Sequence, residues 1–344
     1  MTMLILGHWA TRLAAAAAVT MLAVSPATAL DTVTFGTNWK AQAEHGGYYQ
    51  AVADGTYERY GLSVTIRQGG PNINHPQLLA AGKLDFNMGG NMFGTFNYLA
   101  NKVPMVTVAA NFQKDPQILM VHPDSPYQKL ADLKGATILI SKAGQITFWE
   151  WLKKVYGFTD DQIRPYTFNP GPFIANKDWA QQGYVTSEPF AIEQVASFSP
   201  GVFLLADNGY RSYSTTIDTS WKLVEENPDL VQRFVDATAI GWVNYLYGDP
   251  SAANALIKID NPDISDAQLA YSRSKMNEYG IADSGDALTL GINAMTDDRW
   301  LSFFTFAVDV GPYSQDLPLD RGYTLQFVNK GVGLERKQEL LAKQ

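Results

Sequence analysis

The chain has 344 residues, no cysteine and a formal net charge of −8 at pH 7 with its histidines neutral. Without cysteine there can be no disulfide, no thiolate metal site and no cysteine nucleophile. The acidic balance, which is spread without long charged runs, argues against nucleic acid or an anionic membrane as the partner.

Residues 1–29 have the pattern of a secretory signal peptide. They contain one arginine, Arg12, no acidic residue, an apolar run from Leu13 to Val24, and the small residues Ala27-Thr28-Ala29 where cleavage is expected. The run is short for a membrane span, and no later segment approaches the roughly 20 apolar residues that a spanning helix needs. We therefore expect an exported, periplasmic, monomeric protein.

Strand and helix patterns alternate in the next part of the chain. β-rich runs at 32–38 and 62–69 flank a helical pattern at 46–61, and helix–strand pairs follow at 75–90 and 91–112. This alternation predicts a mostly parallel α/β sheet.

A second, smaller α/β unit is predicted after Asp115. Its strands, helices and helix–strand pairs are expected at 117–125, 130–141, 143–158, 165–169, 183–187 and 201–207. From Ser220 onward strand signals fade and helical patterns dominate, so this helical tail should pack on one of the two units.

The stretch "QQGYVTSEPF" at 181–190 places a carboxylate between a predicted strand and a predicted helix. Because Pro189 suits a helix start and biases Glu188 toward an extended backbone, Glu188 should lie on a strand-to-helix turn. Such turns lie at the carboxyl edge of open α/β sheets, where ligands usually bind. The alternative is a solvated acid that complements the helix dipole, worth about 0.3–1 kcal/mol.

The other strand ends supply further candidates for ligand binding. Trp39 could form an aromatic wall for a planar ligand, or pack without any role in binding. His45 could cap the helix that follows it or bond the ligand. Helix starts near residues 89–91 and 141–147 could offer amide groups to acceptor atoms, or be ordinary turns. The remaining candidates, all near predicted strand ends or helix starts, are Tyr48, Tyr49, Asn91, Asn111, Phe112, Ser141, Gly144, Gln145, Thr147 and Asn169.

Four segments, "YYQAVADGTYERYGLSVTI", "LAAGKLDFNMGG", "KLADLKGATILIS" and "GYVTSEPFAIEQ", occur in an order and spacing that resemble a known group. The chain resembles the periplasmic substrate-binding proteins of ABC importers in the NMT1/THI5-like group, which includes binders of thiamin pyrimidine precursors and is related to nitrate, sulfonate and taurine binders. The resemblance implies a type II periplasmic binding protein fold, with two α/β lobes, a ligand cleft and a helical C-terminal tail. One lobe would comprise 30–114 and 216–344 and the other 115–215, closing on the ligand as hinged bodies.

The resemblance further implies a binding protein that hands its ligand to a permease in the inner membrane. Glu188 favours a small nitrogen-rich heteroaromatic, such as a thiamin pyrimidine precursor, because a carboxylate accepts hydrogen bonds from an amidine-like edge and repels nitrate or a sulfonate. The same import role for riboflavin, another aromatic, a sulfonate or nitrate stays open, and Arg211, near the predicted second crossing, could meet an anionic group.

An enzyme is the least favoured class. A thiamin-pyrimidine synthase of the same fold group carries a cysteine-rich iron motif, and this chain has no cysteine. The histidines form no i, i+4 metal pair, and no nucleophile elbow or phosphate loop is present. We expect no catalytic residue, no metal site and no cofactor.

Overall fold

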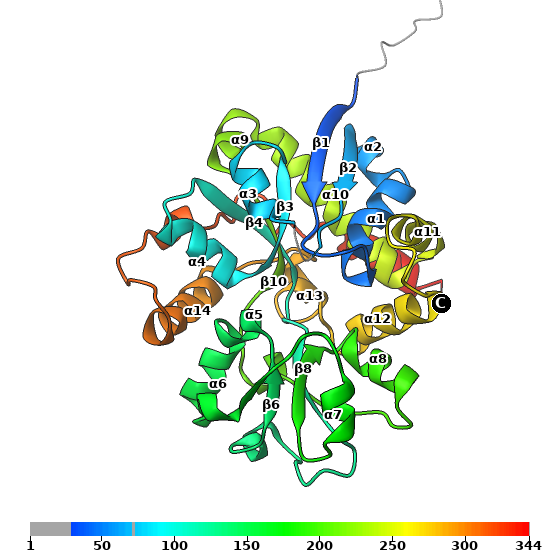
Figure 1. Cartoon of the computed structure of the whole chain (residues 1–344). Coiled ribbons are helices and arrows are strands. Elements are labelled where there is room, and N and C mark those ends of the chain that lie inside the picture. The colour runs from blue at the N-terminus through cyan, green and yellow to red at the C-terminus, as the bar shows by residue number, and fades with distance from the viewer. Residues whose placement is uncertain (1–28, 71–72, 344) are drawn as a thin grey trace, which may run out of the picture.

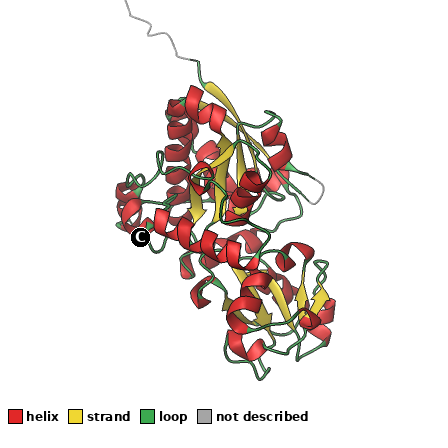
Figure 2. Ribbon diagram, turned by 90° about the vertical axis from the view of Figure 1, so that its left-hand side faces the viewer, coloured by secondary structure: helices red, strands yellow, loops and turns green. Residues whose placement is uncertain are grey.

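The computed structural model describes residues 29–70 and 73–343, and the predicted signal peptide up to residue 28 lies outside these ranges. Within them the chain forms two α/β lobes, each built around a five-stranded sheet (Figure 1). The expected fold class is therefore confirmed. Figure 2 shows the strands of each lobe flanked by helices.

The first lobe begins with a βα alternation. Its elements are β1 (Asp31–Gly36), η1 (Ala43–His45), α1 (Gly46–Ala53), α2 (Thr56–Arg59), β2 (Leu62–Arg67), α3 (His75–Ala80), β3 (Phe86–Asn91), α4 (Met92–Ala100) and β4 (Met105–Phe112). The strand order is β2-β1-β3-β10-β4, with β1 parallel to both β2 and β3. Strand β10 (Ser214–Ser220), which returns from the second lobe, lies antiparallel between β3 and β4.

The second lobe repeats this construction on a smaller scale. Its elements are β5 (Gln117–Val121), η2 (Leu130–Leu133), β6 (Ile138–Ile140), α5 (Lys142–Gln145), α6 (Phe148–Tyr156), η3 (Asp160–Gln162), β7 (Ile163–Pro165), α7 (Gly171–Ala175), β8 (Ala180–Tyr184), α8 (Glu188–Val195), β9 (Gly201–Leu204) and η4 (Ala206–Asn208). The strand order is β7-β6-β8-β5-β9, with β6, β7 and β8 parallel. The chain therefore crosses between the lobes twice, at 113–116 and at 209–213.

The tail after β10 is helical. It consists of α9 (Trp221–Glu226), α10 (Pro228–Tyr247), α11 (Ser251–Asp260), α12 (Asp266–Glu278), α13 (Ala287–Leu290), α14 (Asp297–Val310), η5 (Leu319–Arg321) and α15 (Leu334–Leu341). Most of it covers the first lobe, where α10 packs on α1, but α14 contacts both α4 of the first lobe and α6 of the second. The tail thus touches both lobes, whereas the sequence suggested only one. None of the helices within the described residues is long and apolar enough to span a bilayer.

Several predicted elements differ from the structure. The helix predicted at 143–158 is split into α5 and α6. The helical pattern at 46–61 is split into α1 and α2 by Gly55, whose φ of 71° lies in the left-handed region. The strand predicted at 165–169 ends at Pro165, and Phe168 takes a φ of 62°, which lies outside the range of a strand. The strand predicted at 183–187 ends at Tyr184, and a turn follows it.

The glycine pair after His45 serves helix packing. A Cβ on Gly46 would collide with the ring of Tyr245, and one on Gly47 would collide with the ring of Trp242, both on α10. The two glycines therefore let α1 approach α10 more closely than side chains would allow.

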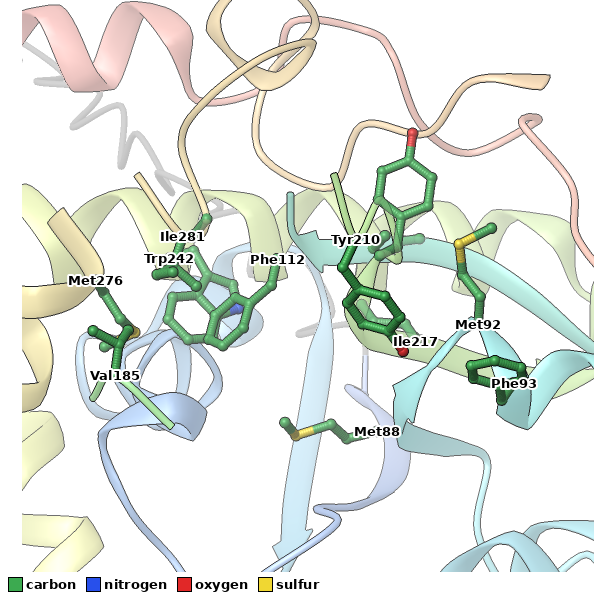
Figure 3. Packing of buried hydrophobic residues seen from close by; sticks show 14 of the residues in the cluster. Met88, Met92, Phe93, Phe112, Val185, Tyr210, Ile217, Trp242, Met276 and Ile281 are labelled. Carbon is green, nitrogen blue, oxygen red and sulfur yellow. The ribbon is translucent and has the colours of Figure 1, made fainter. Parts of the chain in front are cut away.

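The hydrophobic core is continuous between the lobes. One cluster of buried residues contains Leu119 of the second sheet and Ile217 of the first. Figure 3 shows Ile217 together with other members of this cluster. It also includes Val185, which follows β8, together with Met276 and Ile281 from the tail. The two lobes therefore share buried apolar surface at their junction.

Candidate functional site

The loops after the parallel strands of the two lobes meet. The ring of Trp39, after β1, and the ring of Phe168, after β7, have centroids 6.0 Å apart and planes inclined by 32°. Ligands of open α/β sheets bind at this carboxyl edge of the strands. We call the residues that meet here the interlobe seam: Trp39, Glu44, Tyr166, Phe168, Thr186 and Glu188.

The second lobe contributes an exposed aromatic ring to the seam. Phe168 is 63% exposed, and its ring packs on that of the buried Tyr166, with centroids 5.2 Å apart. A positive φ is uncommon for a large side chain and costs free energy, so the surrounding loop must hold Phe168 in place. An exposed apolar ring at a strained backbone position is typical of a ligand contact rather than of a core.

Glu188 is the first residue of α8 and folds back over the end of β8. Its Oε2 accepts a hydrogen bond from the backbone N–H of Tyr184, with an N–O distance of 2.7 Å. Burial raises the pKa of Glu188 to about 7, against the lowering effect of the backbone hydrogen bonds, and Glu44 adds a further increase by charge repulsion. The pKa of Tyr166 is raised first by burial and then by Glu188, so this carboxyl group lies near the aromatic residues of the seam.

Glu44 lies across the seam from Glu188, in the first lobe. It is 3% exposed, and one carboxyl oxygen accepts a hydrogen bond from the hydroxyl of Thr186, which precedes α8. Burial raises the pKa of Glu44, while the bond from Thr186 lowers it. The hydrogen bond joins the two lobes directly.

A third buried acid, Asp115, lies in the first crossing between the lobes. Its carboxyl group accepts hydrogen bonds from the backbone N–H of Gln117, at 3.0 Å, and from the side chain of Asn91. Burial raises the pKa of Asp115 to about 7. Tyr184 is half-buried, and Asp115, Glu188 and Glu44 are all close enough to raise the pKa of its hydroxyl beyond the effect of burial. Three acids from three separate segments thus surround one tyrosine.

Several predicted site residues lie inside the first lobe. His45 is fully buried, its Nε2 is 3.2 Å from Oδ1 of Asn38, and burial lowers its pKa to about 3. The hydroxyl of Tyr48 donates to Asn111, and Tyr49 donates to Asp260 at 2.6 Å. The ring of Phe112 meets that of Trp242 edge-on, with centroids 5.3 Å apart. The structure places these residues behind the seam.

Other predicted residues stabilise turns at the strand ends. Oγ of Ser141 accepts from the N–H of Gly144, Thr147 donates to a carbonyl one turn back, and Asn91 and Asn169 each accept an N–H two residues on. Gln145 is half-buried at the end of α5. Arg211 is exposed in the second crossing, and its carbonyl oxygen accepts from the guanidinium of Arg299 at 2.9 Å.

A groove of about 480 Å³ runs beside the seam, between α8 of the second lobe and the start of α12. Its walls combine apolar side chains with neutral polar ones, and Glu44 reaches it from the seam. Its lining residues are Lys40, Gln42, Glu44, Ser187, Phe190, Ala191, Gln194, Val195, Asn261, Asp263, Ile264, Ser265, Gln268 and Ser272. Within residues 29–70 and 73–343, no three His, Cys, Asp or Glu side chains are grouped so as to hold a metal ion.

Sequence reasoning did not select five residues of this region: Glu44, Asp115, Tyr166, Phe168 and Thr186. The local sequence gives four of them only a weak indication of a role in the site. Glu44 is an acid beside a histidine in "AEHGG", Asp115 is an acid before a proline in "QKDPQ", and the two aromatic residues precede Asn-Pro-Gly in "PYTFNPG". Only the packing of distant segments brings them to one place.

Residues 42–253, more than half of the chain, match the family described as NMT1/THI5 like. The chain belongs to the NMT1/THI5-like family. This range contains both crossings between the lobes and, apart from Trp39, every residue of the seam.

Individual relatives share only a small part of their sequence with this chain. The riboflavin-binding protein RibY of Chloroflexus aurantiacus is 25% identical over 320 residues, covering 88% of this chain and 87% of the relative. The alkanesulfonate-binding protein SsuA from Xanthomonas axonopodis pv. citri, solved bound to MOPS, has a TM-score of 0.59 and 13% identity over 85% of this chain and 98% of its own. The desulfurization enzyme DSZB has a TM-score of 0.53 and 17% identity over 90% of this chain and 99% of its own. At these identities the two structures establish the shared fold only.

Proposed function

We propose that the chain is the substrate-binding component of an ABC importer and captures a flat, nitrogen-rich heteroaromatic compound between its two lobes. The observation that carries this proposal is the pair of rings, Trp39 and Phe168, which meet from opposite lobes. Their contact leaves no room for a third ring, so the lobes must separate to admit a ligand and then close on it. Offset stacking on two aromatic faces suits a planar molecule.

The buried acids narrow the chemistry of the ligand. Glu188 adjoins the aromatic residues, and its raised pKa leaves it part protonated at neutral pH. A carboxyl group in this state can accept a hydrogen bond from a ring N–H or amino group, or donate one to a ring carbonyl. Riboflavin and thiamin pyrimidine precursors both offer such an edge, and the relative named for riboflavin binding supports testing riboflavin first.

A sulfonate is the second candidate, because a sulfonate-binding protein shares the fold. Its fixed negative charge would lie near Glu44, Asp115 and Glu188, whose pKa values are already raised by burial. These acids offer an anion no pairing charge, and any of them that ionised would repel it. We therefore rank it below a neutral or basic heteroaromatic.

The same proposal includes export, lobe closure and a membrane partner. Cleavage after Ala29 would leave β1 complete, since it begins at Asp31, whose carboxylate pairs with Arg233 at 2.7 Å. The mature protein would act as a periplasmic monomer, hinge at the crossings near 115 and 210–216, and deliver its ligand to a permease. Mass spectrometry of the exported protein tests this point: a product that retains Arg12 would exclude the cleavage.

Native mass spectrometry of the exported, purified protein is the direct test of the ligand class. We expect a bound planar heteroaromatic, released on mild denaturation, and saturable binding of riboflavin or of an aminopyrimidine by calorimetry. Tight binding of an alkanesulfonate with no binding of either heteroaromatic would replace this proposal by the sulfonate one. Turnover of the bound compound would indicate an enzyme instead.

A further inference from the structure

The turn formed by residues 185–187 is buried against the first lobe, although the chain does not cross there. Val185 and Thr186 are at most 1% exposed. The carbonyl oxygen of Thr186 accepts a hydrogen bond from the hydroxyl of Ser272, at 2.6 Å, and one from the side chain of Gln268, at 3.4 Å, both on α12. On its other side, the Thr186 hydroxyl donates to Glu44.

This turn is therefore a further link between the lobes, beside the two chain crossings and the contacts of α14 with both lobes. It also immediately precedes Glu188, whose carboxyl group bonds the last residue of β8. Any displacement of the turn from the first lobe must move Glu188 relative to Trp39. The bonds to Thr186 thus determine how the second lobe presents Glu188 to the seam.

The surroundings of Glu44 contain little positive charge. Glu188 of α8, Tyr184 of β8 and Tyr245 of α10 face it. His45 beside it has a pKa lowered by burial to about 3, so the imidazole is neutral at physiological pH. Arg273 of α12 faces Tyr245, but its guanidinium donates to three backbone carbonyls. Lys40, on the rim of the groove, pairs with Asp263 at 3.3 Å. None of the ion pairs among the described residues involves Glu44.

We propose that Glu44 is a positioning residue that holds the turn at 185–187, and with it Glu188, in the closed arrangement only while Glu44 carries a proton. The role of Glu188 in this statement depends on the proposed function, whereas the coupling between protonation and closure does not. Loss of the proton would leave a charge buried between the lobes and facing Glu188, and the hydrogen bonds from the Thr186 hydroxyl and from its own backbone offset only part of the cost of this burial. Separation of the lobes returns both carboxylates to water.

The direction of the pH effect follows from the raised pKa values. In the open arrangement both carboxyl groups are hydrated and have ordinary pKa values near 4.3. In the closed arrangement burial raises the pKa of Glu44, and raises that of Glu188 to about 7. Closure is therefore most favoured below the ordinary values and loses this advantage as the pH rises through the raised ones. Each proton taken up on closure changes the closed-to-open ratio by about tenfold per pH unit.

The test uses the ligand-free protein. Because the chain has no cysteine, one exposed residue in each lobe can be replaced for spin labelling, Gln77→Cys on α3 and Ala175→Cys on α7. We expect the distance between the labels to shift from a short to a long population as the pH rises from about 5 to about 8. Glu44→Gln keeps an oxygen that accepts from Thr186 but cannot ionise, so it should keep the short population at higher pH. The closed-to-open ratio of this variant should change less steeply with pH than that of the wild type, by about tenfold less per pH unit.

Two further variants separate this coupling from general effects of charge. Glu193→Gln removes an exposed acid from the same helix, α8, and should leave the wild-type pH dependence unchanged. Thr186→Val removes the hydroxyl donor at similar volume and should favour the long population at every pH. An unchanged distance across the pH range in the wild type, or a full wild-type slope in Glu44→Gln, overturns the inference. Because no ligand is present, these results stand whether or not riboflavin binds.

Discussion

At the scale of single residues, two roles of Glu188 can be tested separately: its hydrogen bond with the backbone of Tyr184 and its proposed contact with the ligand. Glu188→Gln keeps an oxygen that can accept from the N–H of Tyr184, so the melting temperature of the ligand-free protein should change little. The variant loses the charge, so ligand affinity should fall by about 1.5–3 kcal/mol, tenfold to hundredfold, above the Glu188 pKa of about 7. Calorimetry and thermal unfolding measure the two quantities. Unchanged affinity with a lower melting temperature would mean that Glu188 only caps the end of β8.

Phe168 allows a cleaner test of the aromatic contact, because its ring is 63% exposed and contributes little to the core. Phe168→Leu removes the aromatic face and should weaken binding of a planar ligand by about 0.5–1.5 kcal/mol, up to roughly tenfold. Phe168→Tyr keeps the ring and serves as the matched control, with near wild-type affinity. Equal affinity for Phe168→Leu and the wild type would exclude stacking on this ring.

At the scale of elements, sequence patterns located most strands and helices but not the turn that matters most. Strands β1 and β2 lie where alternating and β-branched residues predicted them, and β3 lies where a strand was predicted after a helix ending at Gly82. The run after Tyr184 contains Val185 and Thr186, which favour strands, yet both lie in a turn. Contacts with α12 outweigh the local preference, and no local pattern could reveal a partner 86 residues away.

Helices α1 and α10 provide a test of packing between elements. Gly47→Ala places a methyl group against the ring of Trp242, and such overpacking costs typically about 1–3 kcal/mol, so thermal unfolding should show a lower melting temperature. Gly94→Ala, inside α4, is the control, because nothing lies within 4 Å of a Cβ there. In that position alanine should stabilise the helix by about 0.5–1 kcal/mol. Similar effects of the two substitutions would show that α1 does not need its close approach to α10.

At the scale of the whole molecule, the two lobes were predictable because the register of strand and helix patterns changes near Asp115. The set of residues that form the interlobe seam was not predictable from the sequence. Glu44 and Thr186 are separated by 142 positions, and each has an ordinary local setting, an acid near a helix start and a threonine after a strand. Their role arises only when the lobes face each other, which sequence periodicity within either lobe cannot encode.

Buried acids also determine how the stability of the whole protein should respond to pH. Burial raises the pKa of Asp115 and Glu188 to about 7 and that of Asp218, in the first sheet, to about 6, while Glu44 is raised as well. Because unfolding returns these groups to ordinary values near 4, the folded state binds more protons than the unfolded state between about pH 4 and pH 7. The free energy of unfolding therefore falls as the pH rises through this window.

Burial of a histidine opposes this trend. His45 is neutral when buried, with a pKa of about 3, so its contribution to stability is lost as the pH falls below the ordinary histidine value near 6.5. Four acids nevertheless outweigh one histidine, so the melting temperature should decrease as the pH rises from about 5 to about 7. Calorimetric scans of the ligand-free protein measure this dependence. Asp115→Asn should make the melting temperature depend less on pH, because the variant has one fewer group that takes up a proton on folding. A melting temperature that instead increases over this range would show that the buried acids remain ionised in the folded protein.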